Sequence, residues 1–326
     1  MTAPSRTRPS AGRLSADKLS ASRLSQPRTL SIGVVGAGRV GTALAAKLTG
    51  AGHRAVAASG SSRSSRRRIA TFLPRAERLS PVEVAHRCDL LILSVPDDAL
   101  GSLVTTLAEA DAFQPGQVVL HTSGAHGVAI LAPAAIAGAG VLALHPAMTF
   151  SGQGTDLTHL AEGISYGVTA PTALRPLAEQ LVKDLGGTVE WISESARPLY
   201  HAALAHGANH LVTLVNEAMD RLRDAGVAHP DRVLSPLLHA ALDNTLAHGD
   251  AALTGPIARG DAGTVARHLA ILADTAPESV ATYRALARRT ADRAIASGRL
   301  APTDAEPLLG VLASPRPAGQ PDGVSA

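Results

Sequence analysis

Polar side chains follow two apolar runs in the middle of the chain, where they could take part in chemistry. The run Gln117–His121 is followed by Thr122-Ser123-Gly124, and Val141–Leu144 leads into His145-Pro146. Ligands of an open parallel sheet bind beyond the carboxyl ends of its strands. Histidine titrates near neutral pH and can serve as a proton donor there. We therefore predict that His145 acts on a substrate, with the alternative that its ring only caps its loop, and we expect Ser123 at the neighbouring strand end to lie on the nicotinamide side.

A second polar set lies on a long helix predicted from Ala196 to Ala225. At 100° per residue, one 100° arc of this helix collects His201, Asn209, Asn216 and Asp220. This polar stripe interrupts a surface rich in Ala and Leu. Such a stripe either makes buried hydrogen bonds within the core or faces a substrate. If the stripe faces a substrate, His201 and Asn209 are further candidate catalytic residues.

Two other chemistries are disfavoured by the same residues. His206 and His210 have the i, i+4 spacing of zinc ligands, but no Glu follows His206, so the HExxH pattern is absent and no metal site is predicted. Ser123 is not in a G-x-S-x-G elbow, which argues against a serine hydrolase. The single cysteine, Cys88, cannot form an intramolecular disulfide, so we expect a reducing, cytoplasmic location.

A glycine-rich turn near the start of the chain predicts dinucleotide binding. Ser31–Val35 reads as a buried strand, Thr42–Thr49 as a helix, and between them stands Gly36-Ala37-Gly38-Arg39-Val40-Gly41. In this context the glycines allow a tight turn and the close approach of a pyrophosphate to the helix N-terminus. Gly36, Gly38, Arg39, Val40 and Gly41 are therefore candidate cofactor-binding residues. The alternative is an ordinary strand-to-helix turn.

The residues after the second predicted strand, Arg54–Ala58, indicate which dinucleotide binds. An NAD site places Asp or Glu about 20 residues after the first glycine, but this chain has Ser59, Ser61 and Arg63 there. Hydroxyls and a guanidinium can hold a 2′-phosphate, which a carboxylate would repel. NADP(H) is therefore the predicted cofactor. Val95 and Pro96, at the end of the predicted strand Asp89–Val95, are expected to lie beside the nicotinamide.

The order of elements predicts an α/β fold, with a Rossmann dinucleotide-binding domain followed by an all-helical C-terminal domain. Buried runs alternate with helical patterns up to residue 193, and helical spacing alone follows. We expect a disordered basic arm at 1–28, the Rossmann domain at 29–193, a helical substrate and dimerisation domain at 194–313, and a disordered tail at 314–326.

Composition and charge exclude several function classes. The net charge is +3, and the arm alone carries six basic residues and one Asp, so the rest of the chain is at −2. A nearly neutral body argues against a duplex-binding surface, and seven aromatic residues are too few for a base-stacking platform. We therefore expect no nucleic-acid partner. The uncharged stretch Gly127–Leu144 is interrupted by Pro133, Gly138 and Gly140, so we expect no membrane span there.

Six motifs in a fixed order give the chain a family resemblance. They are GAGRVG (36–41), SVPDDAL (94–100), LHTSG (120–124), LHPAMTF (144–150), YHAALAHGANHLVTL (200–214) and LTGPIARGDAGTVARHL (253–269). With these motifs the chain resembles the Rossmann-like proteins that carry a C-terminal domain of unknown function 2520. This group is similar to the superfamily of 6-phosphogluconate dehydrogenase-like enzymes, which includes pyrroline-5-carboxylate reductase and ketopantoate reductases.

The resemblance implies an NADPH-dependent oxidoreductase that reduces a small 2-oxo acid, with ketopantoate as the first candidate. It implies that Asn209 holds the substrate, although the lysine that related dehydrogenases place four residues earlier is Ala205 here. His145 and Ser123 resemble a histidine and serine of prephenate dehydrogenases and could replace that lysine. Thr254 and Arg259 match a substrate-binding loop, and a homodimer is implied.

Four other functions remain open. Three are enzymes: a pyrroline-5-carboxylate-type imine reductase, a prephenate-type dehydrogenase and a deazaflavin-dependent NADP reductase. The last is a non-catalytic NADP(H)-sensing protein, which the missing lysine keeps in consideration.

Overall fold

A computed structural model describes residues 29–313 of the chain. These residues form two compact units that divide between Ala208 and Asn209. The predicted basic arm and the predicted tail lie outside the described residues. The domain boundary that the sequence suggests, between residues 193 and 194, stays a proposal.

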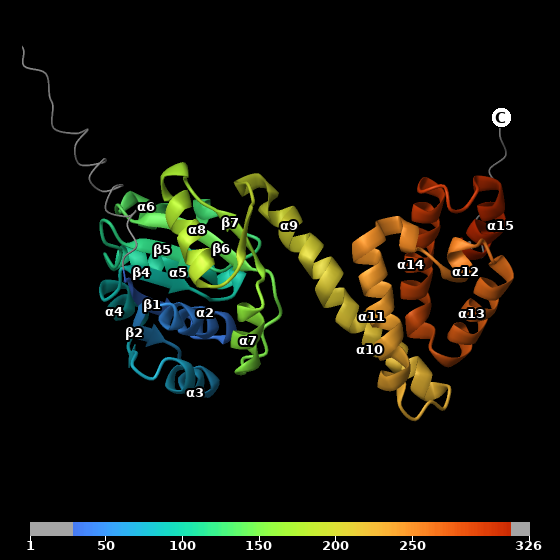
Figure 1. Cartoon of the computed structure of the whole chain (residues 1–326), viewed down its shortest axis with the longest axis horizontal. Coiled ribbons are helices and arrows are strands. Elements are labelled where there is room, and N and C mark those ends of the chain that lie inside the picture. Colours follow the sequence, from blue (N-terminus) through green and yellow to red (C-terminus); the bar gives the residue numbers. More distant parts are fainter. Residues whose placement is uncertain (1–28, 314–326) are drawn as a thin grey trace, which may run out of the picture. The chain divides into compact units, whose positions relative to one another are not determined.

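The first unit is built on one eight-stranded sheet in the order β3-β2-β1-β4-β5-β6-β7-β8 (Figure 1). The strands from β3 to β6 are parallel to one another, β6 and β7 are antiparallel, and β7 and β8 are again parallel. Their bounds are β1 Ser31–Val35, β2 Arg54–Ser59, β3 Glu77–Arg78, β4 Leu90–Leu93, β5 Val118–His121, β6 Gly140–Pro146, β7 Ser165–Thr169 and β8 Thr188–Trp191. The strand order reverses between β1 and β4, which is where open α/β sheets bind ligands.

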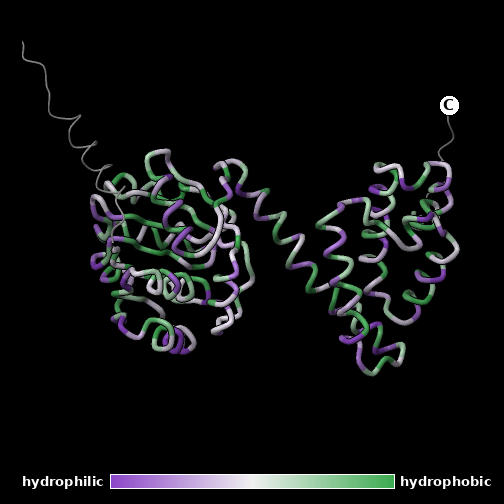
Figure 2. The backbone as a smooth tube through the Cα atoms, viewed as in Figure 1, coloured by the Kyte–Doolittle hydropathy of each residue, from purple (hydrophilic) through white to green (hydrophobic). Residues whose placement is uncertain are grey.

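Helices cover both faces of the sheet, and the strands are apolar on both sides. Leu90 and Ile92 pack into a core with α2, α7 and α8, whereas Leu91 and Leu93 pack into a second core with α4, α5 and α6. Figure 2 shows the hydrophobic residues along the central strands. Continuous apolar runs are expected when a parallel sheet is buried on both faces. The helix bounds are α2 Arg39–Gly50, α3 Arg63–Phe72, α4 Pro81–His86, α5 Asp97–Glu109, α6 Ala132–Ile136, α7 Thr155–Ala161 and α8 Arg175–Asp184.

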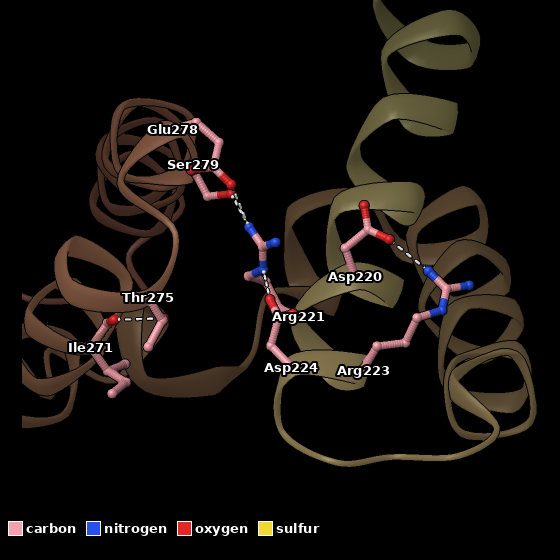
Figure 3. A network of polar contacts seen from close by, with 8 residues as sticks. All are labelled: Asp220, Arg221, Arg223, Asp224, Ile271, Thr275, Glu278 and Ser279. Carbon is pink, nitrogen blue, oxygen red and sulfur yellow. Dashed lines mark hydrogen bonds and ion pairs between the residues drawn. The ribbon is translucent and has the colours of Figure 1, made fainter.

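The second unit is helical throughout its described residues. Its own core joins α12 to α15, with Val265, Ala291 and Leu308 fully buried. Arg221 links α10 to α14 by donating to Glu278 at 2.9 Å and Ser279 at 3.1 Å, and it also donates to Asp224 at 2.8 Å (Figure 3). The helices are α10 His210–Asp224, α11 Pro230–His248, α12 Gly255–Ala258, α13 Ala262–Thr275, α14 Pro277–Ala296 and α15 Pro302–Leu312.

The long helix predicted from Ala196 to Ala225 is interrupted in the structure. It consists of α9 Arg197–Leu204, a π-helical turn Ala205–Asn209, and α10. A π turn inserts one residue into the helical repeat and often marks a functional segment. The uniform 100° projection used for the polar stripe therefore does not hold across this turn.

The structure agrees with the predicted fold class, an α/β sheet domain followed by a helical domain. None of the described helices is long and apolar enough to cross a membrane.

Candidate active site

The predicted glycine turn joins β1 to α2 at the strand-order reversal. Gly36 has φ +85°, and a Cβ there would overlap the Ser94 carbonyl oxygen. A Cβ on Gly41 would lie 2.9 Å from Ser94 Cβ and 3.0 Å from Val34 Cγ1, so this glycine lets α2 pack on the sheet. At Gly38 the nearest such contact is 3.8 Å away, which leaves this side of the turn open. The three glycines thus fit the turn, the pyrophosphate approach and the packing role of a dinucleotide site.

Two other turn residues flank this open side. Val40 is half-buried in the first turn of α2, and Arg39 is exposed and donates to the Phe150 carbonyl at 3.3 Å. The first turn of α2 contains no acidic residue. Its N-terminal amides can therefore receive the negative charge of a pyrophosphate without a competing carboxylate.

The predicted 2′-phosphate residues lie between β2 and α3. The Ser59 carbonyl accepts from the Ala37 amide at 2.9 Å, which fixes this segment against the glycine turn. Ser61 and Arg63 are exposed, and the first turn of α3 has no acidic residue. Arg66 donates to the Ser61 carbonyl, so at least this arginine shapes the loop. The segment offers hydroxyls, a guanidinium and a helix N-terminus to an anion.

The predicted nicotinamide-side residues follow β4. Pro96 is exposed at the N-terminus of α5, and Val95 is half-buried. Val95 Cγ1 would lie 2.8 Å from a Cβ on Gly36, so the segment after β4 borders the glycine turn directly.

His145 lies at the carboxyl end of β6 beside the rings of Tyr200 and His201. Its Nδ1 is 2.9 Å from the hydroxyl of Tyr200, and the two rings are nearly perpendicular. The ring of His201 is edge-on at 5.9 Å between centroids. A Cβ on Gly124 would lie 2.7 Å from His201 and 3.1 Å from His145 Nε2. The structure therefore brings together the predicted His145 and His201 with the Ser123-Gly124 loop.

This environment keeps the His145 ring neutral. Its pKa is lowered to about 4, first by burial and then by the positive charges that His201 and Arg197 can carry, while Asp97 acts weakly in the opposite direction. Each positive neighbour disfavours the imidazolium. At neutral pH His145 therefore carries a single N–H.

Arg197 is a fully buried cation that fastens α9 to the sheet. Its guanidinium donates to Thr169 Oγ1 at 2.8 Å and to the carbonyls of Ser123, Ala143 and Gly167 at 3.0–3.3 Å. These acceptors belong to β6, β7 and the loop after β5. The hydrogen bonds offset the cost of burying the charge, and they fix the frame around His145.

The hydroxyl of Ser123 shapes its own loop. Ser123 is buried, and its Oγ accepts from the amides of Ala125 and His126 at 3.2 Å. Beneath it, fully buried His121 accepts from the Ser123 amide at Nδ1 and donates from Nε2 to the Gly127 carbonyl at 2.8 Å. Burial lowers the pKa of His121 to about 4. The role of Ser123 in chemistry stays a prediction.

The other predicted site residues belong to the second unit. Asn209 ends the π-helical turn and is exposed. Thr254 and Arg259 flank the short helix α12, and both side chains are exposed.

Four residues of the His145 cluster were not identified from the sequence. Tyr200 and Arg197 appeared as members of an amphipathic helix, and Gly124 and Gly167 as ordinary loop and strand residues. The one signal that could have found Tyr200 and Arg197 was their position one and four residues before His201, at the start of the helix that carries the polar stripe.

Two family descriptions match successive parts of the chain. A Rossmann-like domain matches residues 16–146, and the domain of unknown function DUF2520 matches residues 164–290. The second match begins at the last two strands of the sheet and continues through most of the helical unit. No curated protein matches the chain.

Several solved structures share the fold at low sequence identity. A Bacteroides fragilis protein described as an NADP oxidoreductase is 22% identical, with a TM-score of 0.68 over 81% of this chain and 98% of its own. An imine reductase from Myxococcus stipitatus in complex with NADP+ is 15% identical, with a TM-score of 0.57 over 82% and 94%. A 1-pyrroline-5-carboxylate reductase from Streptococcus pyogenes is 18% identical, with a TM-score of 0.54 over 82% and 98%.

These comparisons agree with the geometry described above. The chain shares its fold with these solved structures over more than four fifths of its length, and the resemblance read from the six motifs is confirmed. The chain thus matches a Rossmann-like domain and a DUF2520 domain in succession, the combination that the six motifs resemble.

Proposed function

We propose that the protein is an NADPH-dependent reductase of a small carbonyl compound. The observation that carries this proposal is the position of two features on one sheet. The glycine turn follows β1, and the His145 cluster lies at the carboxyl ends of β5 and β6. A dinucleotide site and a hydrogen-bond donor on the same sheet edge suit the reduction of a carbonyl group.

NADP(H) is the proposed cofactor. Gly36, Gly38 and Gly41 would hold its pyrophosphate, Ser59, Ser61 and Arg63 its 2′-phosphate, and Val95 and Pro96 would flank the nicotinamide. The lack of a carboxylate at the start of α3 supports NADP(H) over NAD(H). When bound, NADPH supplies the hydride that the carbonyl carbon accepts. The neighbours described as an NADP oxidoreductase and solved with NADP+ support the same choice.

His145 would hydrogen-bond the carbonyl oxygen as negative charge develops on it. Within residues 29–313, Nδ1 is bonded to Tyr200 and Nε2 has no protein partner, so Nε2 is the nitrogen available to a substrate. A neutral imidazole can polarise a carbonyl by donating its N–H. His201 lies beside it and is the second candidate for this role. Asn209, Thr254 and Arg259 stay predicted substrate residues of the helical unit.

Local charge favours a carboxylated carbonyl compound, so a 2-oxo acid is the proposed substrate class. Arg197 acts on the pKa of His145 more strongly than Asp97 does, which makes the surroundings of the ring positive on balance. Such surroundings attract a carboxylate and disfavour a cation. Ketopantoate is the first member of this class to test.

A cyclic imine is the second candidate substrate. Its support comes from the fold neighbours, an imine reductase and a pyrroline-5-carboxylate reductase, each with a TM-score above 0.5. The positive surroundings of His145 count against it, because an imine is reduced most readily when it is protonated.

We also propose that the enzyme is a cytoplasmic homodimer. Only Pro230 is buried in the 19 residues of α11, and apolar side chains on opposite sides of this helix are exposed, namely Val233, Leu237, Leu242 and Leu246. A helix that is apolar on opposite faces is normally enclosed by other elements. A second copy of the chain would enclose it.

The test is NADPH oxidation by the purified protein with a panel of 2-oxo acids, including ketopantoate, and a panel of cyclic imines. Turnover with a 2-oxo acid, and faster turnover with NADPH than with NADH, is the expected result. Turnover with imines alone would replace the substrate class. Tight NADPH binding without oxidation on either panel would favour the non-catalytic sensor.

A further inference from the structure

Tyr200 has no role in the function proposed above, yet its hydroxyl is bonded to the proposed donor. The Tyr200 hydroxyl lies 2.9 Å from His145 Nδ1, and the ring centroids are 5.6 Å apart at 88°. Tyr200 lies on α9 and His145 on β6, 55 residues apart in the chain. Three residues before Tyr200, Arg197 anchors the same helix to β6 and β7.

The sheet has space for this hydroxyl because one strand residue lacks a side chain. Gly167 of β7 is paired with His145 across the antiparallel ladder. A Cβ on Gly167 would lie 2.5 Å from the Tyr200 hydroxyl and 2.6 Å from the ring carbon that bears it. Any other residue at 167 would displace the phenol, so the Tyr200–His145 hydrogen bond depends on this glycine.

A neutral histidine cannot complete the proposed reduction unaided. The carbonyl oxygen must end as a hydroxyl, so it must take a proton. A neutral imidazole that gives up its only N–H becomes an anion, which is far too basic to persist at neutral pH. The proton can leave Nε2 only if Nδ1 gains one at the same time. The group placed to supply it is the Tyr200 hydroxyl.

We propose that Tyr200 is the positioning residue of a proton relay: its hydroxyl donates to Nδ1 of His145, which holds the ring hydrogen on Nε2 and replaces that hydrogen as it passes to the substrate. This proposal rests on the proposed function, because it needs His145 to face the carbonyl oxygen. A hydrogen bond to the other ring nitrogen commonly fixes the tautomer of a functional histidine in this way.

The relay balances in protons and electrons. The hydride forms the new C–H bond, and the π electrons of the carbonyl move to oxygen. The O–H bond forms as the Nε2–H bond breaks, and the Nδ1–H bond forms as the phenolic O–H bond breaks. After the product leaves, water gives a proton to Nε2 while the Nδ1 hydrogen returns to the phenolate, which restores the starting tautomer. His145 is only half-buried, so water can reach its ring. Burial raises the pKa of Tyr200, whereas the Arg197 charge and the Gly167 N–H act in the opposite direction and stabilise the transient anion.

The charged and titratable groups around His145 are few and can be controlled. They are Arg197 and His201 on α9, Asp97 on α5 and His121 on β5. None of them lies between Nδ1 and the Tyr200 hydroxyl, which are in direct contact. Replacing Tyr200 by Phe keeps the ring and removes only the donor.

The helical unit provides a matched control. Tyr283 and His268 form a pair of the same kind, with the hydroxyl 2.8 Å from Nδ1 and the rings 5.9 Å apart at 89°. Tyr283→Phe removes the same group from a similar pair that has no part in the proposed relay. Any effect of deleting a buried phenol hydroxyl on folding should therefore appear in both variants.

The first test is nitrogen NMR of the full-length protein labelled at histidine, without substrate. His145, assigned by its loss in His145→Gln, should show a protonated Nε2 and an unprotonated Nδ1. In Tyr200→Phe the ring should become a mixture of tautomers, and Gly167→Ala should give the same mixture with the tyrosine still present. Tyr283→Phe should leave the His145 signals unchanged. A protonated Nδ1 in the parent protein would overturn the proposal.

The second test is turnover on the best substrate found. Tyr200→Phe should lower kcat about 10–100-fold, as expected for a residue that acts through its hydrogen bond to the donor. NADPH affinity should stay unchanged, and the solvent isotope effect on kcat should change. Tyr283→Phe should match the parent. Parent-like turnover of a folded Tyr200→Phe protein would overturn the relay. If the parent oxidises no NADPH, the proposed function fails instead, and the NMR result still decides the tautomer.

Discussion

Acid should destabilise the Rossmann domain through His145, by a free energy that follows from the lowered pKa of this residue in the folded protein. The ordinary pKa of histidine is 6.5, and in the folded protein that of His145 is lowered to about 4. Above pH 6.5 neither state binds a proton on this ring. Between pH 6.5 and 4 the unfolded chain binds one and the folded chain does not, so stability falls as the pH falls. From these two pKa values, the loss from pH 7.5 to pH 5 is about 2 kcal/mol for His145 alone.

The only tryptophan of the chain allows this domain to be followed separately. Trp191 lies in β8, and the guanidinium of Arg175 stacks on its ring at 4.6 Å. Its fluorescence during urea unfolding reports on the sheet and not on the helical unit. We expect the parent to lose about 2 kcal/mol more than His145→Gln between pH 7.5 and pH 5.

The comparison cancels the other groups that titrate in this range. Fully buried His121, with a pKa also lowered to about 4, contributes to the parent and the variant alike. The carboxyl of Asp156, whose pKa is lowered by hydrogen bonds from Ser151 and Gly152 despite burial, loses its stabilising effect only at lower pH. Equal pH dependence in the parent and His145→Gln would refute the neutral, buried state of His145 and the mechanism built on it.

Three other predictions concern the cofactor and the assembly. Arg63→Ala should weaken NADPH binding by about 1.5–3 kcal/mol and leave NADH binding little changed, measured by calorimetry; tighter binding of NADH than NADPH by the parent would contradict the 2′-phosphate site. Gly36→Ala should lower NADPH affinity, and it should lower domain stability by about 1–3 kcal/mol, because φ at this residue is +85° and Ser94 leaves no room for a Cβ. Unchanged NADPH affinity would contradict the pyrophosphate site. Leu246→Lys on exposed α11 should shift the protein to a monomer in light scattering, and an unchanged mass would remove α11 from the interface.

Local signals in the sequence predicted most of the fold. Apolar runs such as Leu90–Leu93 and the glycines at 36 and 41 depend on neighbouring residues only, and the structure has them where expected. The direction of β7 could not be predicted, since Ser165–Thr169 has the same pattern whether it pairs parallel or antiparallel with β6. The π turn at Ala205–Asn209 was missed because the helical repeat was assumed to be uniform.

The His145 cluster shows why site geometry was harder to predict than the fold. Tyr200 reaches His145 across 55 residues of sequence, and Arg197 reaches Ser123 across 74. Contacts between residues so far apart in the sequence produce no periodic pattern that sequence analysis could detect. Gly167 has no side chain that could mark it in the sequence, and only the position of Tyr200 explains why a glycine stands there. The sequence could name the histidine, but not the residues that set its protonation.

The proposed mechanism would also account for the alanine at position 205, where the family resemblance places a lysine. A lysine combines two properties in one group, a positive charge near the substrate and a proton that can leave. In this chain Ala205 has neither, and the two properties are separated. Arg197 supplies a permanent charge, held by four hydrogen bonds, that cannot release its proton. Burial first, and then the charges that His201 and Arg197 can carry, lower the pKa of His145, so the ring stays neutral. On the proposed mechanism a neutral ring depends on a second proton donor behind it, and the Tyr200 hydroxyl is in contact with Nδ1.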